Sequence, residues 1–397
     1  MSDQQGSIFE VFKTFLKLGL TSFGGPVAHI GYFRKALLEQ RQWLTESQFT
    51  QLLAICQFLP GPASSQLGFA IGLLRAGWGG AIAAFLAFTL PSALLLIVFA
   101  SLLPALSGGI GAAAIHGLKL VACAVVADAV LGMSKKLCPD FQRRAIALFA
   151  IGALLLLSSA WSQLLVVAAG AVAGMVLCRE AVSNTEAPLQ LGYSKSLALV
   201  LLTLFTLLLL GLPMISGDNG IANVARTFFQ AGALVFGGGH VVLPLLEQSV
   251  VTSGWVSPEH FLAGYGASQA IPGPMFAFAA YLGTIIPVDQ SPLLIAATAL
   301  LFIFLPGFLL VTAALPLWQA IAHNPKAVNA IAGLNAAVVG ILAAALYDPI
   351  FTAGITSIAD LLIAVIGFAM LTVWKRSPLM VVLWCVAASL VKFKLGY

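Results

Sequence analysis

Two Pro-Gly-Pro motifs interrupt apolar stretches of this sequence, and their residue types suit the binding of an anion. The motifs lie in the matching segments Gln57–Pro62 and Gln269–Pro274. A helix cannot run straight through either segment, because proline removes an amide donor and glycine adds backbone freedom. A helix that restarts at Pro62 or Pro274 would direct free amides and its positive dipole end away from the break. Such a helix start binds anions with few full charges.

Polar side chains flank the two motifs and would add hydrogen-bond donors. Ser64 and Ser65 follow the first motif, whereas apolar residues follow the second, so the predicted site is more polar on the first side. Gln57 and Gln269 come three residues before the breaks. Each amide either donates to an oxyanion or clamps the broken backbone. The prolines themselves either shape a binding site or only kink packed helices.

A glycine cluster precedes each motif. The clusters lie in Phe23–Pro26 and Phe236–Gly239, and they allow close backbone approach to an anion or to a neighbouring helix. The predicted substrate-binding residues are Gly24, Gly25, Pro26, Gln57, Pro60, Gly61, Pro62, Ser64, Ser65, Gly237, Gly238, Gly239, Gln269, Pro272, Gly273 and Pro274.

Several ionisable residues are candidates for coupling or for attracting anions. Histidine titrates near neutral pH, so a histidine beside each glycine cluster either couples protons or makes hydrogen-bonded packing contacts. A lysine in the middle of an apolar segment is a functional candidate by default. Arginine and lysine at segment ends either gather anions or are solvated loop charges. These residues are His29, Lys119, His240, Arg34, Lys35 and Arg75.

The composition is that of a polytopic membrane protein. Of 397 residues, 60% are hydrophobic and 8% are charged, whereas soluble domains carry about 25% charge. With about 20 apolar residues per span, about a dozen hydrophobic segments are expected. The net charge of +5 suits cationic loops at a membrane surface better than nucleic-acid binding. The start of the chain lacks the cationic region of a cleavable signal peptide, so we expect the first apolar stretch to be retained.

The second half of the chain repeats the first. Trp43 matches Trp255, and the glycine clusters and Pro-Gly-Pro motifs recur in the same order. We predict a first membrane repeat in residues 1–180, a polar linker in 181–195 and a second membrane repeat in 196–397. The fold class is therefore all-α, with two homologous halves and broken or re-entrant helices at the Pro-Gly-Pro motifs. The apolar helix Leu197–Leu212 has no counterpart before the first repeat.

The extra helix favours an inverted arrangement of the two copies, as in many secondary transporters. We predict one interrupted helix from Ile8 to about Phe33, and a Pro-Gly-Pro segment that either spans the membrane once or re-enters. If the segment spans once, the basic residues near 34–41 and those near 135–144 fall on opposite sides. A re-entrant segment reverses this conflict without removing it, so the charges leave the topology open.

The paired motifs resemble those of the chromate ion transporter family, in its two-copy bacterial form. The resemblance covers essentially the whole chain: Phe23–Pro26 and Gln57–Pro62 in one copy, and Phe236–Gly239 and Gln269–Pro274 in the other. It implies efflux of chromate from the cytoplasm across the inner (plasma) membrane, with chromate resistance as the result. The membrane potential or proton exchange would drive it. Sulfate, also a tetrahedral dianion, is the expected competitor; a transporter of sulfate or another inorganic anion is the alternative.

Other protein classes find less support. The sequence contains no His-Glu-x-x-His, Gly-x-Ser-x-Gly or Walker motif, so neither an intramembrane hydrolase nor an ATP-driven pump is expected. The five cysteines include no Cys-x-x-Cys pair, which argues against a disulfide framework and a zinc site. We expect no enzymatic activity, no cofactor and no metal. The oligomeric state stays open, with a homodimer among the choices.

Overall fold

The computed structural model describes residues 6–106, 108–156, 162–179, 193–215, 220–318 and 323–396, and over these residues it contains helices and no strands. The all-α prediction is confirmed. Five described helical segments are long and apolar enough to cross a membrane by length and composition: Ala63–Leu106, Gly109–Leu137, Lys195–Met214, Pro292–Leu317 and Pro325–Gly354. Most of the predicted linker lies outside the described residues.

The two copies contain corresponding helices in the same order along the chain. The first copy contains α1 (Ile8–Thr21), α2 (Gly25–Phe33), the π-helix η1 (Arg34–Gln40), α3 (Glu46–Phe58), α4 (Ala63–Leu102), η2 (Leu103–Leu106), α5 (Gly109–Leu137), α6 (Phe141–Leu156) and α7 (Ser162–Leu177). The unpaired helix α8 (Lys195–Ile215) comes next. The second copy contains α9 (Ile221–Ala233), η3 (Gly239–Val241), α10 (Val242–Leu246), η4 (Glu247–Val251), α11 (Pro258–Ser268), η5 (Met275–Ala277), α12 (Phe278–Ile285), α13 (Pro292–Ala314), η6 (Leu315–Leu317), α15 (Pro325–Ala345), η7 (Leu346–Phe351), α16 (Thr352–Gly354), α17 (Ile358–Thr372) and α18 (Pro378–Lys394).

Helices α1 and α2 fold back on each other at the first glycine cluster. Gly24 and Gly25 have φ values of 100° and 76°, which glycine adopts without the penalty that a side chain brings. The two ends of the hairpin away from this turn are also close together: Arg41, just after η1, has its Nη1 3.4 Å from Oε1 of Glu10 in the first turn of α1. The predicted interruption of the Ile8–Phe33 segment at the glycine cluster is confirmed, but its two parts form a hairpin and not one helix.

Helix α3 and the first part of α4 form a second hairpin, with the first Pro-Gly-Pro motif at its tip. A capping box at Thr45 begins α3, just after Trp43. Arg75, near the end of the first part of α4, lies 5.3 Å from the centre of the Trp43 ring and 3.4 Å from Glu10. Both ends of the hairpin thus lie at one end of the molecule, and the segment re-enters. Helix α4 then kinks at Gly77 and continues to the opposite end.

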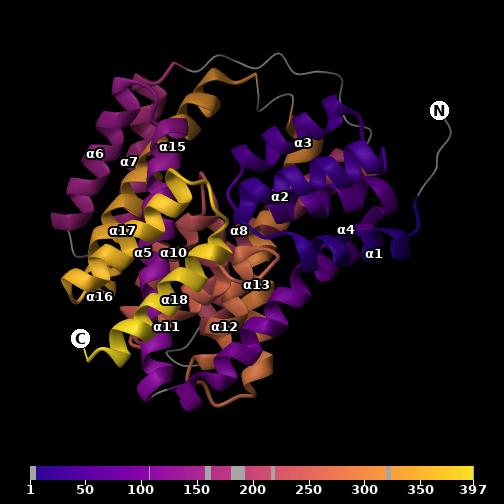
Figure 1. The fold of residues 1–397 in the computed structure, drawn as a ribbon. Helices are drawn as coiled ribbons and strands as arrows, with labels where there is room; N and C mark the ends of the chain where they lie inside the picture. Colours follow the sequence, from indigo (N-terminus) through magenta and orange to yellow (C-terminus); the bar gives the residue numbers. More distant parts are fainter. Residues whose placement is uncertain are drawn as a thin grey trace.

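In the second copy, the hairpin formed by α11 and α12 has its open end at that opposite end of the molecule. The Tyr281 hydroxyl of α12 donates to the His260 carbonyl near the start of α11 (2.7 Å). Phe99, near the far end of α4, stacks on Tyr281 with ring centres 5.8 Å apart. Figure 1 shows α2 and α3 at the upper right and α11 and α12 at the bottom. The two copies are therefore inverted with respect to each other.

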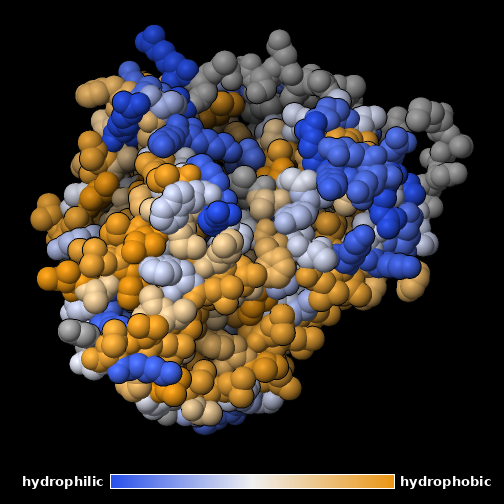
Figure 2. Space-filling view, in the orientation of Figure 1, coloured by the Kyte–Doolittle hydropathy of each residue, from blue (hydrophilic) through white to orange (hydrophobic). Residues whose placement is uncertain are grey.

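The two ends of the molecule differ in charge. We call the end with the openings of the first-copy hairpins the basic face, because its residues include Arg34, Lys35, Arg41, Arg75, Lys135, Lys136, Arg143 and Arg144, and we call the opposite end the distal face. Since both first-copy hairpins fold back, the basic residues near 34–41 and near 135–144 share one face. The conflict expected from the sequence disappears. Figure 2 shows hydrophilic residues gathered at the top and upper right, with a broad hydrophobic surface below them.

Each hairpin tip of one copy bonds to the glycine turn of the other. The Gly61 amide donates to the Val235 carbonyl (2.7 Å), and the Gly273 amide donates to the Ser22 carbonyl (2.9 Å). These two bonds join equivalent positions, as expected for copies related by a pseudo-twofold axis. The predicted site residues therefore gather where the two copies meet.

Close contact between α7 and α15 gives a first prediction. A Cβ at Gly333 would collide with the Gly170 carbonyl and the Gly174 backbone, so Gly333→Val is expected to lower stability by about 1–3 kcal/mol. Thermal unfolding of the purified protein in detergent measures the change. Gly152→Val is the matched control, because a Cβ at Gly152 meets nothing within 4 Å. A Gly333→Val melting temperature equal to wild type would refute this packing.

Candidate functional site

A cavity of about 420 Å³ lies between the first Pro-Gly-Pro hairpin, the second glycine turn and helix α15. Gln57 and Gly61 line it from the hairpin, Gly237 and Gly238 from the glycine turn, and Asn335 from α15. The remaining lining residues are Ala54, Cys56, Phe58, Leu59, Ala63, Lys136, Leu137, Arg143, Trp318, Val328, Ile331 and Ala332. The cavity thus runs from the basic face to the point where the two copies meet.

The charges on the cavity wall are all positive. Lys136 comes from the end of α5 and Arg143 from the first turn of α6, and no carboxylate is among the lining residues in the described part of the chain. Both Lys136 and Gln57 are exposed, so the cavity is accessible from the basic face. Cationic and amide donors without a competing acid on the wall are suited to binding an anion.

Asp140 orients Arg143 from outside the cavity wall. Its Oδ1 accepts the Arg143 amide at 2.9 Å, and its Oδ2 accepts from Arg143 Nε at 2.6 Å. Asp140 therefore caps the start of α6. The backbone and side-chain hydrogen bonds from Arg143 hold the pKa of Asp140 below its ordinary value. These hydrogen bonds thus hold the Arg143 guanidinium in place at the cavity wall.

Neutral donors complete the cavity. The Oδ1 atom of Asn335 is buried without a hydrogen-bond partner among the described residues. The side chain of Asn335 lies beside Gly237, whose positive φ of 75° requires glycine or a strained residue. Gln57 and Asn335 can each offer an amide NH₂ group to an oxyanion.

The serines that the sequence predicted as donors lie elsewhere. Ser64 Oγ is buried 3.4 Å from His29 Nδ1, and His29 Nε2 lies 3.2 Å from the Ser22 carbonyl. Ser65 is also buried, and neither serine lines the cavity. Ser64 and Ser65 come two and three residues after Pro62, and the first turn of α4 directs Ser64 toward His29 of α2.

The Pro-Gly-Pro residues of the second copy also lie away from this cavity. Gln269 is buried, and its amide donates to Ser268 Oγ at 3.2 Å and to Met275 Sδ at 3.4 Å. His240 Nδ1 lies 2.7 Å from the Tyr265 hydroxyl. Pro272, Gly273 and Pro274 form the second tip, against Ser22. The cavity therefore combines residues of the first Pro-Gly-Pro motif with residues of the second glycine cluster, and the second Pro-Gly-Pro motif is not among its described lining residues.

The other sequence candidates divide between the tips and the basic face. Gly24, Gly25 and Pro26 form the first glycine turn, and Pro26 packs beside Gly239. Arg34 pairs with Glu46 at 2.8 Å, and Arg75 pairs with Glu10 at 3.4 Å, while Lys35 is exposed. These cations lie outside the cavity wall. Lys119 is buried near the distal side, with its Nζ 3.4 Å from the Ala353 carbonyl.

Sequence reasoning missed Lys136, Arg143 and Asn335 as site residues. The two cations belong to the densest basic loop of the sequence, and such a loop ordinarily indicates which side of the membrane it lies on, not a binding site. Asn335 is the polar partner of Lys119 in the repeat, and that equivalence was the available signal for a site at this level. Among the described residues, no group of three His, Cys, Asp or Glu side chains could hold a metal ion.

Comparison with known proteins decides the family. The chromate transporter family model matches residues 9–175 and 222–390, one match for each copy. The chain belongs to the chromate transporter family. It is 29% identical to a probable chromate transport protein of Synechococcus elongatus, over 96% of this chain and 95% of that protein. It is 28% identical to a chromate transport protein of Pseudomonas aeruginosa, over 96% and 91% of the two chains. It is 27% identical to a chromate transport protein of Cupriavidus metallidurans, over 96% and 92%.

No solved structure matches this chain. The family assignment therefore rests on the sequence. The structure shows in addition that the two copies are inverted and that each contains a hairpin with a Pro-Gly-Pro tip. The family resemblance drawn from the Pro-Gly-Pro and glycine motifs is confirmed.

Proposed function

We propose that this chain is a secondary transporter that exports chromate from the cytoplasm across the cytoplasmic membrane, and so confers chromate resistance. The observation that carries the proposal is the cavity at the basic face. Its wall combines Lys136, Arg143, two side-chain amides and glycine backbone, and the residues described there include no carboxylate. A compact oxyanion with two charges matches this set of donors. Sulfate shares that chemistry and is the expected competitor.

The charge distribution supports a cytoplasmic position for the basic face. Positive residues concentrate in cytoplasmic loops of membrane proteins. On the distal face the repeat places Glu247 and Gln248 where the basic face has Arg34 and Lys35. Glu247 and Asp348 line a second cavity of about 390 Å³ there, and no cation is among the described residues of its wall. An anion would thus enter from the cytoplasm and leave past acidic surroundings.

The membrane potential is a sufficient driving force for such export. Moving one charge across 100 mV is worth about 2.3 kcal/mol, so a dianion gains about 4.6 kcal/mol when the cytoplasm is negative. That energy corresponds to a gradient on the order of a thousandfold. Proton exchange through the buried His29 or the half-buried His240 is the alternative coupling.

Uptake of chromate into inside-out vesicles tests the proposal. With an interior-positive potential we expect uptake above that of vesicles without the protein, and excess sulfate should suppress it. A pH gradient applied at zero potential separates proton exchange from potential-driven flux. No uptake under either driving force would overturn chromate as substrate. Uptake of labelled sulfate at an equal or higher rate would reassign the protein as a sulfate transporter.

Asp140→Asn is expected to strengthen chromate binding. Asparagine retains the N-cap but removes the charge that competes for Arg143. Because a partly exposed ion pair of this kind is worth up to about 1 kcal/mol, the half-saturating chromate concentration should fall about two- to fivefold. Initial rates of vesicle uptake over a chromate series give this value. An unchanged or higher half-saturating concentration would contradict a role for Arg143 in binding.

A further inference from the structure

Residues that line the open cavity on the basic side have equivalents in the other copy, and these equivalents lie in a closed region on the distal side. Asn335 and Lys119 are equivalent, because each follows a Gly-Leu pair in the matching helices α15 and α5. Leu137 is likewise equivalent to Ala353, since both come twenty positions after that glycine. On the basic side Asn335 and Leu137 line open space. On the distal side Lys119 Nζ lies 3.4 Å from the Ala353 carbonyl, so the equivalent residues are in contact.

A third equivalent pair differs in charge. Arg143 is the third residue after the N-cap Asp140 of α6, and Asp360 is the third residue after the N-cap Ser357 of α17. Arg143 lines the open cavity. Asp360 is completely buried on the distal side. Where one copy presents a cation to open space, the other therefore holds a carboxylate inside the protein.

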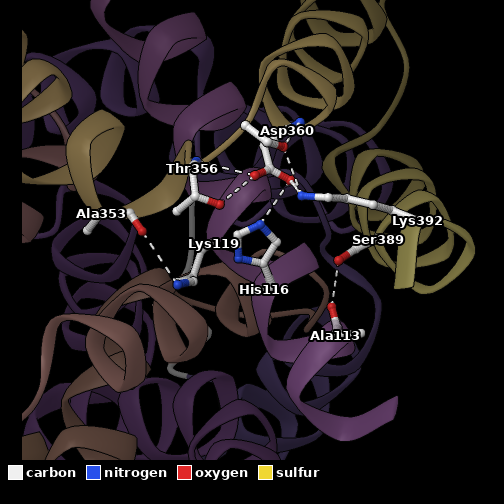
Figure 3. Close-up of polar contacts among 9 residues, drawn as sticks. Ala113, His116, Lys119, Ala353, Thr356, Asp360, Ser389 and Lys392 are labelled. Carbon is white, nitrogen blue, oxygen red and sulfur yellow. Dashed lines mark hydrogen bonds and ion pairs between the residues drawn. The ribbon is translucent and has the colours of Figure 1, made fainter. Parts of the chain in front are cut away.

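The buried carboxylate ties three helices together (Figure 3). Asp360 Oδ1 lies 2.7 Å from Lys392 Nζ of α18 and 3.0 Å from His116 Nε2 of α5. Its Oδ2 accepts hydrogen bonds from the hydroxyl (2.8 Å) and the amide (3.2 Å) of Thr356. Breaking a buried, hydrogen-bonded ion pair leaves an uncompensated charge, so the cluster holds α5, α17 and α18 in one arrangement.

Lys119 lies one turn of α5 from His116, on the side nearer the middle of the molecule. Lys119 is 9% exposed, and its ammonium group donates to the neutral Ala353 carbonyl. A buried ammonium group in a membrane protein is costly and marks an ion path by default. Its position matches that of Asn335 in the open cavity, where an anion would bind.

We propose that the distal half contains a second anion-binding cavity, closed in this structure, with Lys119 as its cation and the His116–Asp360–Lys392 cluster as its latch. The proposal rests on the proposed function, because a secondary transporter with inverted repeats exposes its site alternately to the two sides. The open basic-side cavity and the closed distal one are then the two halves of a single inward-facing state. When the latch opens, a tetrahedral dianion such as chromate or sulfate reaches Lys119 from the centre and leaves at the distal face.

Cys123 reports the state of this region, because it lies one turn from Lys119 and is buried, with its Sγ 3.3 Å from the Ile350 carbonyl. The protein for the test keeps Cys123 and has serine at the other four cysteines. A membrane-impermeant thiol reagent is added to right-side-out and to inside-out vesicles. We expect slow labelling with the latch intact. Asp360→Asn, and separately Lys392→Met, should label at least tenfold faster from right-side-out vesicles and not from inside-out vesicles.

Two controls make the labelling interpretable. Glu46→Gln removes an ion pair on the basic face and should leave the rate unchanged, and size-exclusion chromatography shows that each variant is folded. Folded Asp360→Asn and Lys392→Met proteins that both label at the rate of the intact latch would overturn the proposal. Faster labelling from both vesicle orientations would also overturn it, because it would indicate general loosening.

Protection by sulfate tests the anion site itself. Sulfate is used because chromate oxidises thiols. In Asp360→Asn, sulfate should slow the labelling of Cys123 at least fivefold, and Lys119→Gln added to that variant should remove the protection. No protection, or equal protection without Lys119, would overturn the role of Lys119. Labelling requires no flux, so the predicted pattern in a protein without chromate uptake would support the latch while overturning chromate as the substrate.

Discussion

Gly61→Val is expected to reduce chromate uptake to the level of vesicles without the protein. Gly61 has a φ of 121°, a conformation in which a β-branched residue is strongly disfavoured. A Cβ there would also lie 3.0 Å from Gly307 Cα and from Gln66 Nε2. The new side chain would therefore shift the hairpin tip, break the bond from the Gly61 amide to Val235 and narrow the cavity that this tip lines.

The measurement is vesicle uptake normalised to the amount of inserted protein. Gly211→Val is the matched control, because Gly211 lies in α8 and a Cβ there meets nothing within 4 Å. The Pro60→Ala/Pro62→Ala variant, and the matching variant at Pro272 and Pro274, should lose transport in the same way and keep insertion. Uptake near the wild-type rate in Gly61→Val or in these variants would contradict a role for the tips in transport.

The double variant Lys136→Gln/Arg143→Gln is expected to raise the half-saturating chromate concentration roughly 30-fold. Each partly exposed cation is worth about 1 kcal/mol toward an anion in the cavity, and about 2 kcal/mol together correspond to this factor. The maximal rate should change less, because the hairpins remain intact. The check is a chromate concentration series in inside-out vesicles at fixed potential.

Lys135→Gln separates cavity binding from general surface attraction. Lys135 is an exposed neighbour of Lys136 and is not on the cavity wall. We expect less than a twofold effect at moderate salt, where exposed charges are screened. An effect of Lys135→Gln as large as that of the double variant would show that the basic face only concentrates anions.

The repeat and its breaks could be predicted from the sequence, because proline and glycine act on the backbone locally. The positive φ values at Gly24, Gly61, Gly237 and Gly273 show why those positions carry glycine. Whether a broken segment spans or re-enters could not be predicted in this way. That choice depends on contacts such as those of Arg41 and Arg75 with Glu10, which join residues distant in the sequence.

The site was harder to predict than the fold. Gln57, Gly61, Gly237 and Gly238 line the cavity, and all four belong to the motifs. The cations come from a loop more than seventy residues after the first motif, and the packing of α5 and α6 against α15 brings them to the cavity. Asp360 escaped notice as well, although a carboxylate in the apolar run Ile358–Thr372 is a functional signal that composition alone provides.

The position of bound chromate tests the central claim most directly. Chromium can be located by its anomalous scattering in a crystal of the protein grown with chromate. We predict a chromium peak in the basic-side cavity, within about 4 Å of the donors on Lys136, Gln57 or Asn335, as expected for direct hydrogen bonds to the oxygens around the metal. A chromium peak elsewhere in the protein with this cavity empty would contradict the account.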